Sequence, residues 1–258
     1  MTRSIGPYLR SVALDSEGIP SFDRYPFHLG AVKSLKERSQ LRLHPKVTYI
    51  VGENGMGKST LMEAIAVAWG FNPEGGTKNF SFSTRATHSP LHEWIRLVRG
   101  IHKPRDGFFF RAESYYNLAS HIDDLDSEPS PGPPVKSSYG GKSLHEQSHG
   151  ESFFAAFLHR FGGQGLYILD EPEAALSPFR QMAMLARIHE LVQQNSQFII
   201  STHSPIVMAY PDSVIYDLTP DGIERKAWEE TDHYLIMKQF LLNRDRMTGE
   251  LFGEPADG

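Results

Sequence analysis

The chain has 258 residues, a formal net charge of −5 and no cysteine. Without cysteine there are no disulfides and no thiolate metal sites, and the acidic balance disfavours a protein that binds nucleic acid over its whole surface, although a local basic patch stays open. No apolar run approaches the roughly 18 residues of a membrane-spanning helix. We therefore expect a cytoplasmic globular chain with no direct membrane insertion.

The hydrophobic pattern predicts strands that alternate with helices. Strands are expected at residues 8–15, 27–35, 47–51, 107–111, 165–169, 197–201 and 213–218. Helices are expected at 60–69, 90–98, 115–125, 152–161, 178–194 and 232–242. Residues 218–223 are typical of a hairpin turn. The alternation predicts a three-layer α/β sandwich around a largely parallel sheet, and the early strands without helices predict an antiparallel β lobe beside it.

The same features suggest how the chain is divided. We expect a single domain over residues 1–258, with the antiparallel lobe at about 1–46 and an inserted helical and loop lobe at about 72–147. Within the insertion, residues 126–142 hold four prolines and three glycines, a composition typical of a flexible loop.

A glycine-rich loop follows the apolar strand at 47–51 and precedes the helix at 60–69. Gly52–Ser59 has the spacing of a P-loop, G-x4-G-K-S, and both flanks agree. Glycines let backbone N–H groups point at phosphate oxygens, Lys58 reaches the β- and γ-phosphates, and the Ser59 hydroxyl is a Mg²⁺ ligand. The predicted nucleotide-binding residues here are Gly52, Glu53, Asn54, Gly55, Met56, Gly57, Lys58, Ser59 and Thr60.

Two acids end the apolar strand at 165–169, and in an α/β sheet ligands bind at the carboxyl ends of strands. Asp170 is the expected Mg²⁺ ligand, and Glu171 is expected to orient or deprotonate the attacking water. A polar strand end that merely caps a helix is the plain alternative. The position of the pair, after an apolar strand and downstream of a P-loop, favours the catalytic interpretation.

Five segments in this order resemble the ATPase heads of the ABC superfamily, in particular the soluble heads of SMC and Rad50 proteins and the small ATPases loosely grouped with them as AAA family. They are residues 52–59, 148–151, 166–171, 173–177 and 201–203. The resemblance covers most of residues 47–218 and implies a P-loop NTPase fold of the ABC-ATPase type that uses ATP and Mg²⁺. No heptad run lies between Lys58 and Ser148, so the coiled-coil arms of SMC proteins are missing.

The resemblance also assigns roles to three of these segments. Ser148-His149-Gly150-Glu151 matches the ABC signature, with His149 in place of the usual glycine, and it implies that Ser148, Gly150 and Glu151 bind the γ-phosphate held by another protomer. A capping box made by Ser148 and Glu151 is the local alternative. His203 resembles the switch histidine, which contacts the γ-phosphate and the attacking water. Residues 173–177 resemble the D-loop that crosses the dimer interface, although Ser177 replaces its closing aspartate.

Two expected parts of the site have no clear counterpart. No Q-loop glutamine follows the strand at 107–111, where Glu113 either substitutes for it or pairs with Arg111. Tyr25 and Phe27 are candidates for stacking on adenine, with packing in the core as the alternative.

These observations predict a Mg²⁺-dependent ATPase that forms a homodimer around ATP and drives an unidentified protein partner or DNA, for example in DNA repair or phage defence. One alternative is the ATPase subunit of an ABC transporter. Another is a nucleotide-binding regulatory module of a nuclease complex.

Overall fold

The computed structural model describes residues 6–77, 89–112, 154 and 157–253. The expected helix at 115–125, the loop at 126–142 and residues 152–153 and 155–156 of the expected helix at 152–161 lie outside the described residues. Within that last helix, Phe154 and residues 157–159 are helical. The strands are β1 (Leu9–Leu14), β2 (Leu41–Arg42), β3 (Val47–Gly52), β4 (Ile95–Arg99), β5 (Asp106–Arg111), β6 (Gly165–Asp170), β7 (Gln197–Ser201), β8 (Val214–Thr219) and β9 (Gly222–Lys226). The α-helices are α1 (Gly30–Glu37), α2 (Lys58–Trp69), α5 (Pro178–Gln193), α6 (Asp232–Leu242) and α7 (Arg244–Phe252).

The main sheet has six strands in the order β5-β6-β7-β3-β8-β9. All neighbours are parallel except β8 and β9, which form the expected antiparallel hairpin. The strand that leads into the P-loop, β3, lies in the interior of the sheet, and β7 separates it from β6, which carries the acid pair. The carboxyl ends of these three strands therefore meet at one edge.

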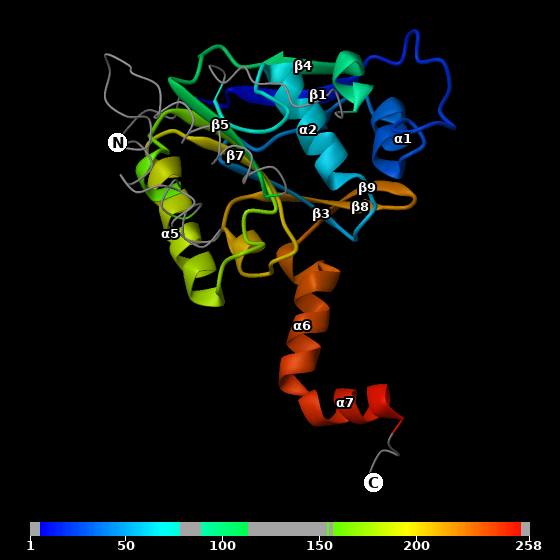
Figure 1. The fold of residues 1–258 in the computed structure, drawn as a ribbon, viewed down its shortest axis with the longest axis vertical. Helices are drawn as coiled ribbons and strands as arrows, with labels where there is room; N and C mark the ends of the chain where they lie inside the picture. Colours follow the sequence, from blue (N-terminus) through cyan, green and yellow to red (C-terminus); the bar gives the residue numbers. More distant parts are fainter. Residues whose placement is uncertain (1–5, 78–88, 113–153, 155–156, 254–258) are drawn as a thin grey trace, which may run out of the picture.

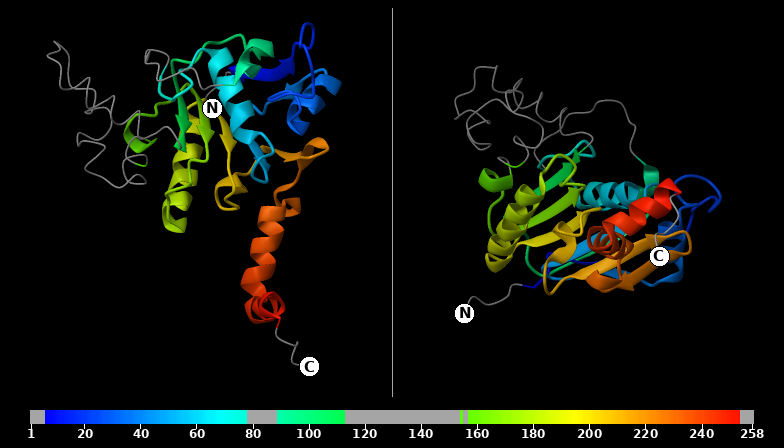
Figure 2. Two further views of the ribbon diagram at one scale, coloured as in Figure 1. Left: turned by 45° about the vertical axis from the view of Figure 1, so that its right-hand side comes forward. Right: turned by 90° about the horizontal axis from the view of Figure 1, so that it is seen from below.

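Helices cover both faces of this sheet (Figures 1 and 2). Because side chains alternate along a strand, β3 and β7 contribute to two separate cores. One core joins α5 to the sheet through Met184, Ile188, Leu191, Val47, Tyr49, Phe198 and Ile200. The other joins α2 to the opposite face through Leu61, Met62, Ile65, Ile50, Ile168 and Ile199. Strands buried on both faces explain why these segments are almost wholly apolar.

A second, antiparallel sheet of three strands, in the order β2-β1-β4, lies beside the α2 core. Its third strand comes from residues 95–99, within the segment expected as an inserted lobe. The mixed α/β fold with a parallel and an antiparallel sheet agrees with the predicted fold class.

Two predicted elements are wrong. The strand expected at 27–35 is instead helix α1, because its buried residues Ala31, Val32 and Leu35 recur with helical spacing. The helix expected at 90–98 is a short 3-10 turn from Pro90 to Trp94 followed by strand β4. Antiparallel pairing with β1 determines the conformation there, a contact that local sequence does not reveal.

Helices α6 and α7 extend away from the body of the protein (Figure 1). Neither has a buried residue, and Leu241, Leu242, Leu251 and Phe252 are exposed. Helix α6 matches its predicted bounds, whereas α7 was not predicted. Among the described residues, no helix is both long and apolar enough to cross a bilayer.

Substitutions at a buried core position and at an exposed apolar position of α6 should differ sharply in their effect on the free energy of unfolding. Replacing Ile200, which is fully buried in the α5 core, with alanine should lower the free energy of unfolding by about 2–5 kcal/mol, because a cavity replaces packed atoms. The control Leu242→Ala on exposed α6 should change it by less than about 0.5 kcal/mol. Urea unfolding of both variants measures the difference, and equal losses would contradict the description of α6 as unpacked.

Candidate functional site

The P-loop joins the buried strand β3 to helix α2, as expected. Gly52 has φ 130°, and a Cβ there would lie 2.4 Å from the carbonyl oxygen of Leu218, so only glycine fits. Gly55 and Gly57 also have positive φ, and Gly57 caps the amino end of α2. The glycine-rich loop therefore leads directly into the amino terminus of α2, where backbone N–H groups can bind phosphate.

Lys58 lies at the first position of α2 and is only 4% exposed. Its Nζ donates hydrogen bonds to the carbonyl oxygens of Gly52 at 2.9 Å and Glu53 at 3.0 Å. Burial lowers the pKa of Lys58, and the carboxylates of Glu171 and Asp170 raise it. The ammonium group is thus folded back over its own loop.

Asp170 ends β6 and is buried at 4% exposure. Its Oδ1 accepts hydrogen bonds from two hydroxyls, that of Ser201 and that of Ser59, the latter at 3.3 Å. Burial raises the pKa of Asp170, and the two hydroxyls lower it. A buried carboxylate beside a serine hydroxyl is a set of hard oxygen donors, so these residues fit Mg²⁺, which binds through one or two protein oxygens plus phosphate.

Glu171 has φ 51°, a left-handed conformation that costs a non-glycine residue about 1–3 kcal/mol. Two hydrogen bonds hold it there, because its N–H donates to the carbonyl oxygen of Ser201 at 3.1 Å and to the Ser201 hydroxyl at 3.2 Å. Oε1 of the Glu171 carboxylate lies 3.4 Å from Nε2 of His203.

The loop after β7 carries His203. Its backbone N–H donates to Oε1 of Glu173 at 2.7 Å, and burial raises the pKa of that carboxyl. Burial also lowers the pKa of His203, as does the charge of Lys58, while Glu171 raises it. The predicted residues Lys58, Ser59, Asp170, Glu171 and His203 therefore meet at one edge of the sheet.

Sequence reasoning missed two residues of this site. The sequence places Ser201 beside His203 without indicating a role for it, yet its hydroxyl bridges Asp170 and Glu171. His233, on α6, lies with its Nε2 3.0 Å from Nδ1 of His203. Nothing in the local sequence marks His233, because thirty residues separate the two histidines.

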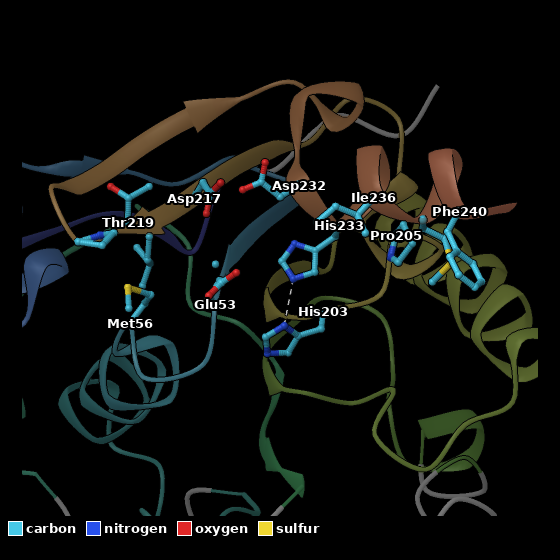
Figure 3. A pocket seen from close by; sticks show the side chains of 14 residues that line it. Glu53, Met56, His203, Pro205, Asp217, Thr219, Asp232, His233, Ile236 and Phe240 are labelled. Carbon is cyan, nitrogen blue, oxygen red and sulfur yellow. Dashed lines mark hydrogen bonds between the residues drawn. The ribbon is translucent and has the colours of Figure 1, made fainter. Parts of the chain in front are cut away.

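A cavity of about 540 Å³ opens beside these groups (Figure 3). The P-loop and the end of β8 form one wall, and α6 forms the other. Its lining includes Glu53, Met56, His203, Asp217, Asp232, His233, Ile236 and Phe240.

The two aromatic candidates for adenine stacking differ. Phe27 is buried and packs edge-on against Trp94 with ring centroids 6.2 Å apart, so it is a core residue. Tyr25 is 59% exposed, and its hydroxyl lies 3.2 Å from Oγ1 of Thr60, at the start of α2. Of the two, only Tyr25 is accessible to a ligand.

Other predicted site residues lie elsewhere. Ser148, Gly150, Glu151 and Glu113 are outside the described residues. Arg111 pairs with Glu63. Within the segment that resembles the D-loop, Ser177 accepts a hydrogen bond from the N–H of Arg180 at 3.4 Å and caps α5.

Two buried serines at opposite ends of β7 provide a matched test. Ser201→Ala should lower the free energy of unfolding by about 1–3 kcal/mol, because Asp170 loses a hydrogen bond in a buried place. It should also weaken the binding of Mg-ATP by about 10-fold, since Asp170 and Glu171 lose their common support.

The control is Ser196→Ala, which removes hydrogen bonds to Gly162 and Gly165 at the distant end of the strand. It should destabilise the fold without weakening nucleotide binding. Urea unfolding and titration calorimetry separate the two effects, and an equal loss of affinity in both variants would refute the role of Ser201.

Two family models match the chain over the segments that build this site. A model described as an AAA domain matches residues 27–103, which contain the P-loop. A model described as an AAA ATPase domain matches residues 152–208, which contain Asp170, Glu171 and His203.

Among curated proteins, the macrolide export ATP-binding/permease protein MacB of Hahella chejuensis (strain KCTC 2396) is 27% identical over 201 residues. That match covers 68% of this chain, and the chain spans only 28% of the length of MacB.

Similar solved structures are ABC proteins and an SMC head. An inward-facing ABC transporter of the metal-chelate type has 15% identity and a TM-score of 0.47, covering 89% of this chain and 87% of that one. CbiO1 of Clostridium perfringens, part of an ABC transporter complex, has 16% identity and a TM-score of 0.44, covering 96% and 99%. An SMC head bound to the C-winged helix domain of ScpA has 14% identity and a TM-score of 0.42, covering 85% and 98%.

The assignment rests on the two AAA matches and on the motifs that they contain. Since the fold brings the P-loop lysine, the acid pair and the histidine together at one sheet edge, the segments that match these models form the site of a P-loop ATPase.

Proposed function

We propose that this ATPase depends on Mg²⁺, closes as a homodimer around ATP and uses the resulting motion to drive a partner. The contact between the Ser59 hydroxyl and Asp170 carries the proposal, because it joins the P-loop helix to the acidic strand end beside buried Lys58. Phosphate-binding amides, a cation and a Mg²⁺-ligand pair in one place suit the β- and γ-phosphates of ATP.

Each residue has a role that its surroundings support. The N–H groups of the loop from Gly52 to Gly57 bind the phosphates, and Lys58 turns from its own loop carbonyls to the β- and γ-phosphate oxygens. Ser59 and Asp170 would hold Mg²⁺, which when bound would neutralise charge that develops on the phosphates.

Hydrolysis requires a water that is oriented and relieved of a proton. Glu171 is the group for this task, since its carboxylate is partly exposed and its backbone is fixed by Ser201. His203 faces Glu171 and supplies a polar contact at the γ-phosphate. Tyr25, exposed beside Thr60, is the candidate for stacking on the base.

The position of the site at one edge of the sheet supports the proposed dimer. In the described part of the chain, all the groups assigned to the phosphates come from the edge of one sheet. Ser148, Gly150 and Glu151 of a second protomer would then complete the site from the opposite side. ATP binding would close the dimer and hydrolysis would open it.

The client of this motion is a protein or DNA, and the chain would work in the cytoplasm, as a single domain with an antiparallel lobe and an insertion. The likeness to MacB favours one other candidate, the ATPase part of a transporter. Co-purification with a membrane protein would support that candidate. A nucleotide-binding module in a nuclease complex would instead bind ATP tightly with negligible turnover.

Replacing Glu171 with glutamine should trap the ATP-bound dimer, since nucleotide still binds while the water is no longer activated. Light scattering with Mg-ATP should show twice the monomer mass, and a further dependence on double-stranded DNA would identify DNA as the client. Glu37→Gln, at an exposed position of α1, is the control and should hydrolyse ATP like the wild type. A Glu171→Gln protein that binds ATP but stays monomeric would contradict the sandwich.

A further inference from the structure

His203 contacts a second element besides the loop that carries it, because its Nδ1 faces helix α6. Nδ1 of His203 lies 3.0 Å from Nε2 of His233, with ring centroids 5.2 Å apart. Figure 3 shows the two imidazoles facing each other, one from the loop after β7 and one from the first turn of α6. A separation of 3.0 Å between two ring nitrogens is a hydrogen bond, and one ring must donate it.

The start of α6 is anchored so that His233 has a fixed position. The hydroxyl of Thr231, a fully buried residue, accepts from the N–H of Tyr234 at 3.4 Å and donates to the carbonyl oxygen of Trp228 at 2.8 Å. The indole N–H of Trp228 in turn donates to the carbonyl oxygen of Pro205 at 3.0 Å. The loop that carries His203 and the helix that carries His233 are therefore tied together.

The surroundings of Nε2 of His203 indicate which of the two rings donates the hydrogen bond. Its Nε2 is buried without a hydrogen-bond partner and faces the Glu171 carboxylate at 3.4 Å. If His203 donated through Nδ1, a lone pair on Nε2 would face that carboxylate, which is repulsive. If His233 donates, Nε2 of His203 carries the proton and faces the carboxylate favourably.

The surroundings of both rings favour the neutral imidazole over the charged form. Burial lowers the pKa of His203, and the charge of Lys58 lowers it further, while Glu171 raises it. Burial likewise lowers the pKa of His233, while Asp217 raises it. A neutral imidazole has one donor and one acceptor nitrogen, so fixing the first nitrogen fixes the second.

We propose that His233 is a positioning residue, which donates its Nε2 proton to His203 and so keeps the proton of His203 on Nε2, where it faces the γ-phosphate and the attacking water. The consequence for turnover rests on the role proposed above for His203, whereas the tautomer itself does not. His233 acts only through His203 and touches no reacting atom.

The tautomer is measured directly by long-range ¹H–¹⁵N correlation spectra of the full-length, histidine-labelled protein, with His203→Gln to assign the signal. Wild-type His203 should carry its proton on Nε2, and His233→Leu should lose this preference. His233→Gln should preserve it, because a glutamine amide can donate from a similar place. A proton on Nδ1 in the wild type, or no change in His233→Leu, overturns the proposal.

Steady-state kinetics provide the second measurement. His233→Leu should lower kcat for ATP by about 10-fold, as loss of a group that orients a functional imidazole does, while KM changes less than about twofold because the phosphate contacts remain. His233→Gln should recover most of kcat. His189→Leu, on α5 away from the site, is the matched control and should leave kcat unchanged.

Combining the His233 and His203 substitutions separates the role of His233 from the role of His203. In a His203→Ala protein, adding His233→Leu should have no further effect on kcat, because a positioning residue needs its target. An equal loss in both backgrounds overturns the positioning role. A His203→Ala protein with wild-type kcat refutes the proposed function of His203, and the spectra still decide the tautomer.

Discussion

A buried carboxylate, that of Asp170, determines how the rest of this site is arranged. A buried ionised group is costly unless hydrogen bonds or a cation compensate it. Hydroxyls from two other elements, Ser201 on β7 and Ser59 on α2, donate hydrogen bonds to this carboxylate. Because Ser201 also receives the N–H of Glu171, the same residue fixes the strained turn that presents the second acid. The position of β7 between β3 and β6 thus connects the phosphate loop to the acid pair.

The geometry also explains why we expect a second protomer at the site and a partner that responds to its motion. Every described group assigned to phosphate lies at one edge of the parallel sheet, so the opposite side of the nucleotide needs other donors. Helix α6 begins at this edge, lines the neighbouring cavity and then extends away with an exposed apolar surface. Through His233 the same helix contacts His203.

Much of this arrangement could be predicted from the sequence, since its signals are local. The P-loop spacing, the apolar strand before Asp170 and the turn signal between β8 and β9 all lie within short segments. The order of strands in the sheet, in contrast, depends on contacts between distant segments. The bridge that Ser201 makes between Asp170 and Glu171 and the contact between His203 and His233 therefore could not be predicted. The strand expected at 27–35 failed because apolar residues at short range fit either period. Residues 95–99 form a strand only because β1 pairs with them.

The most direct test of the account is to mix two inactive variants. Lys58→Met removes the phosphate cation from one protomer, and Ser148→Arg blocks the donors that we assign to the other. Each alone should be inactive. Mixed in equal amounts they should recover about a quarter of the wild-type ATPase rate, because half of randomly formed dimers are mixed and each of these holds one complete site. No recovery, when both variants are folded and mix freely, would mean that the site does not form between protomers and would contradict the central claim.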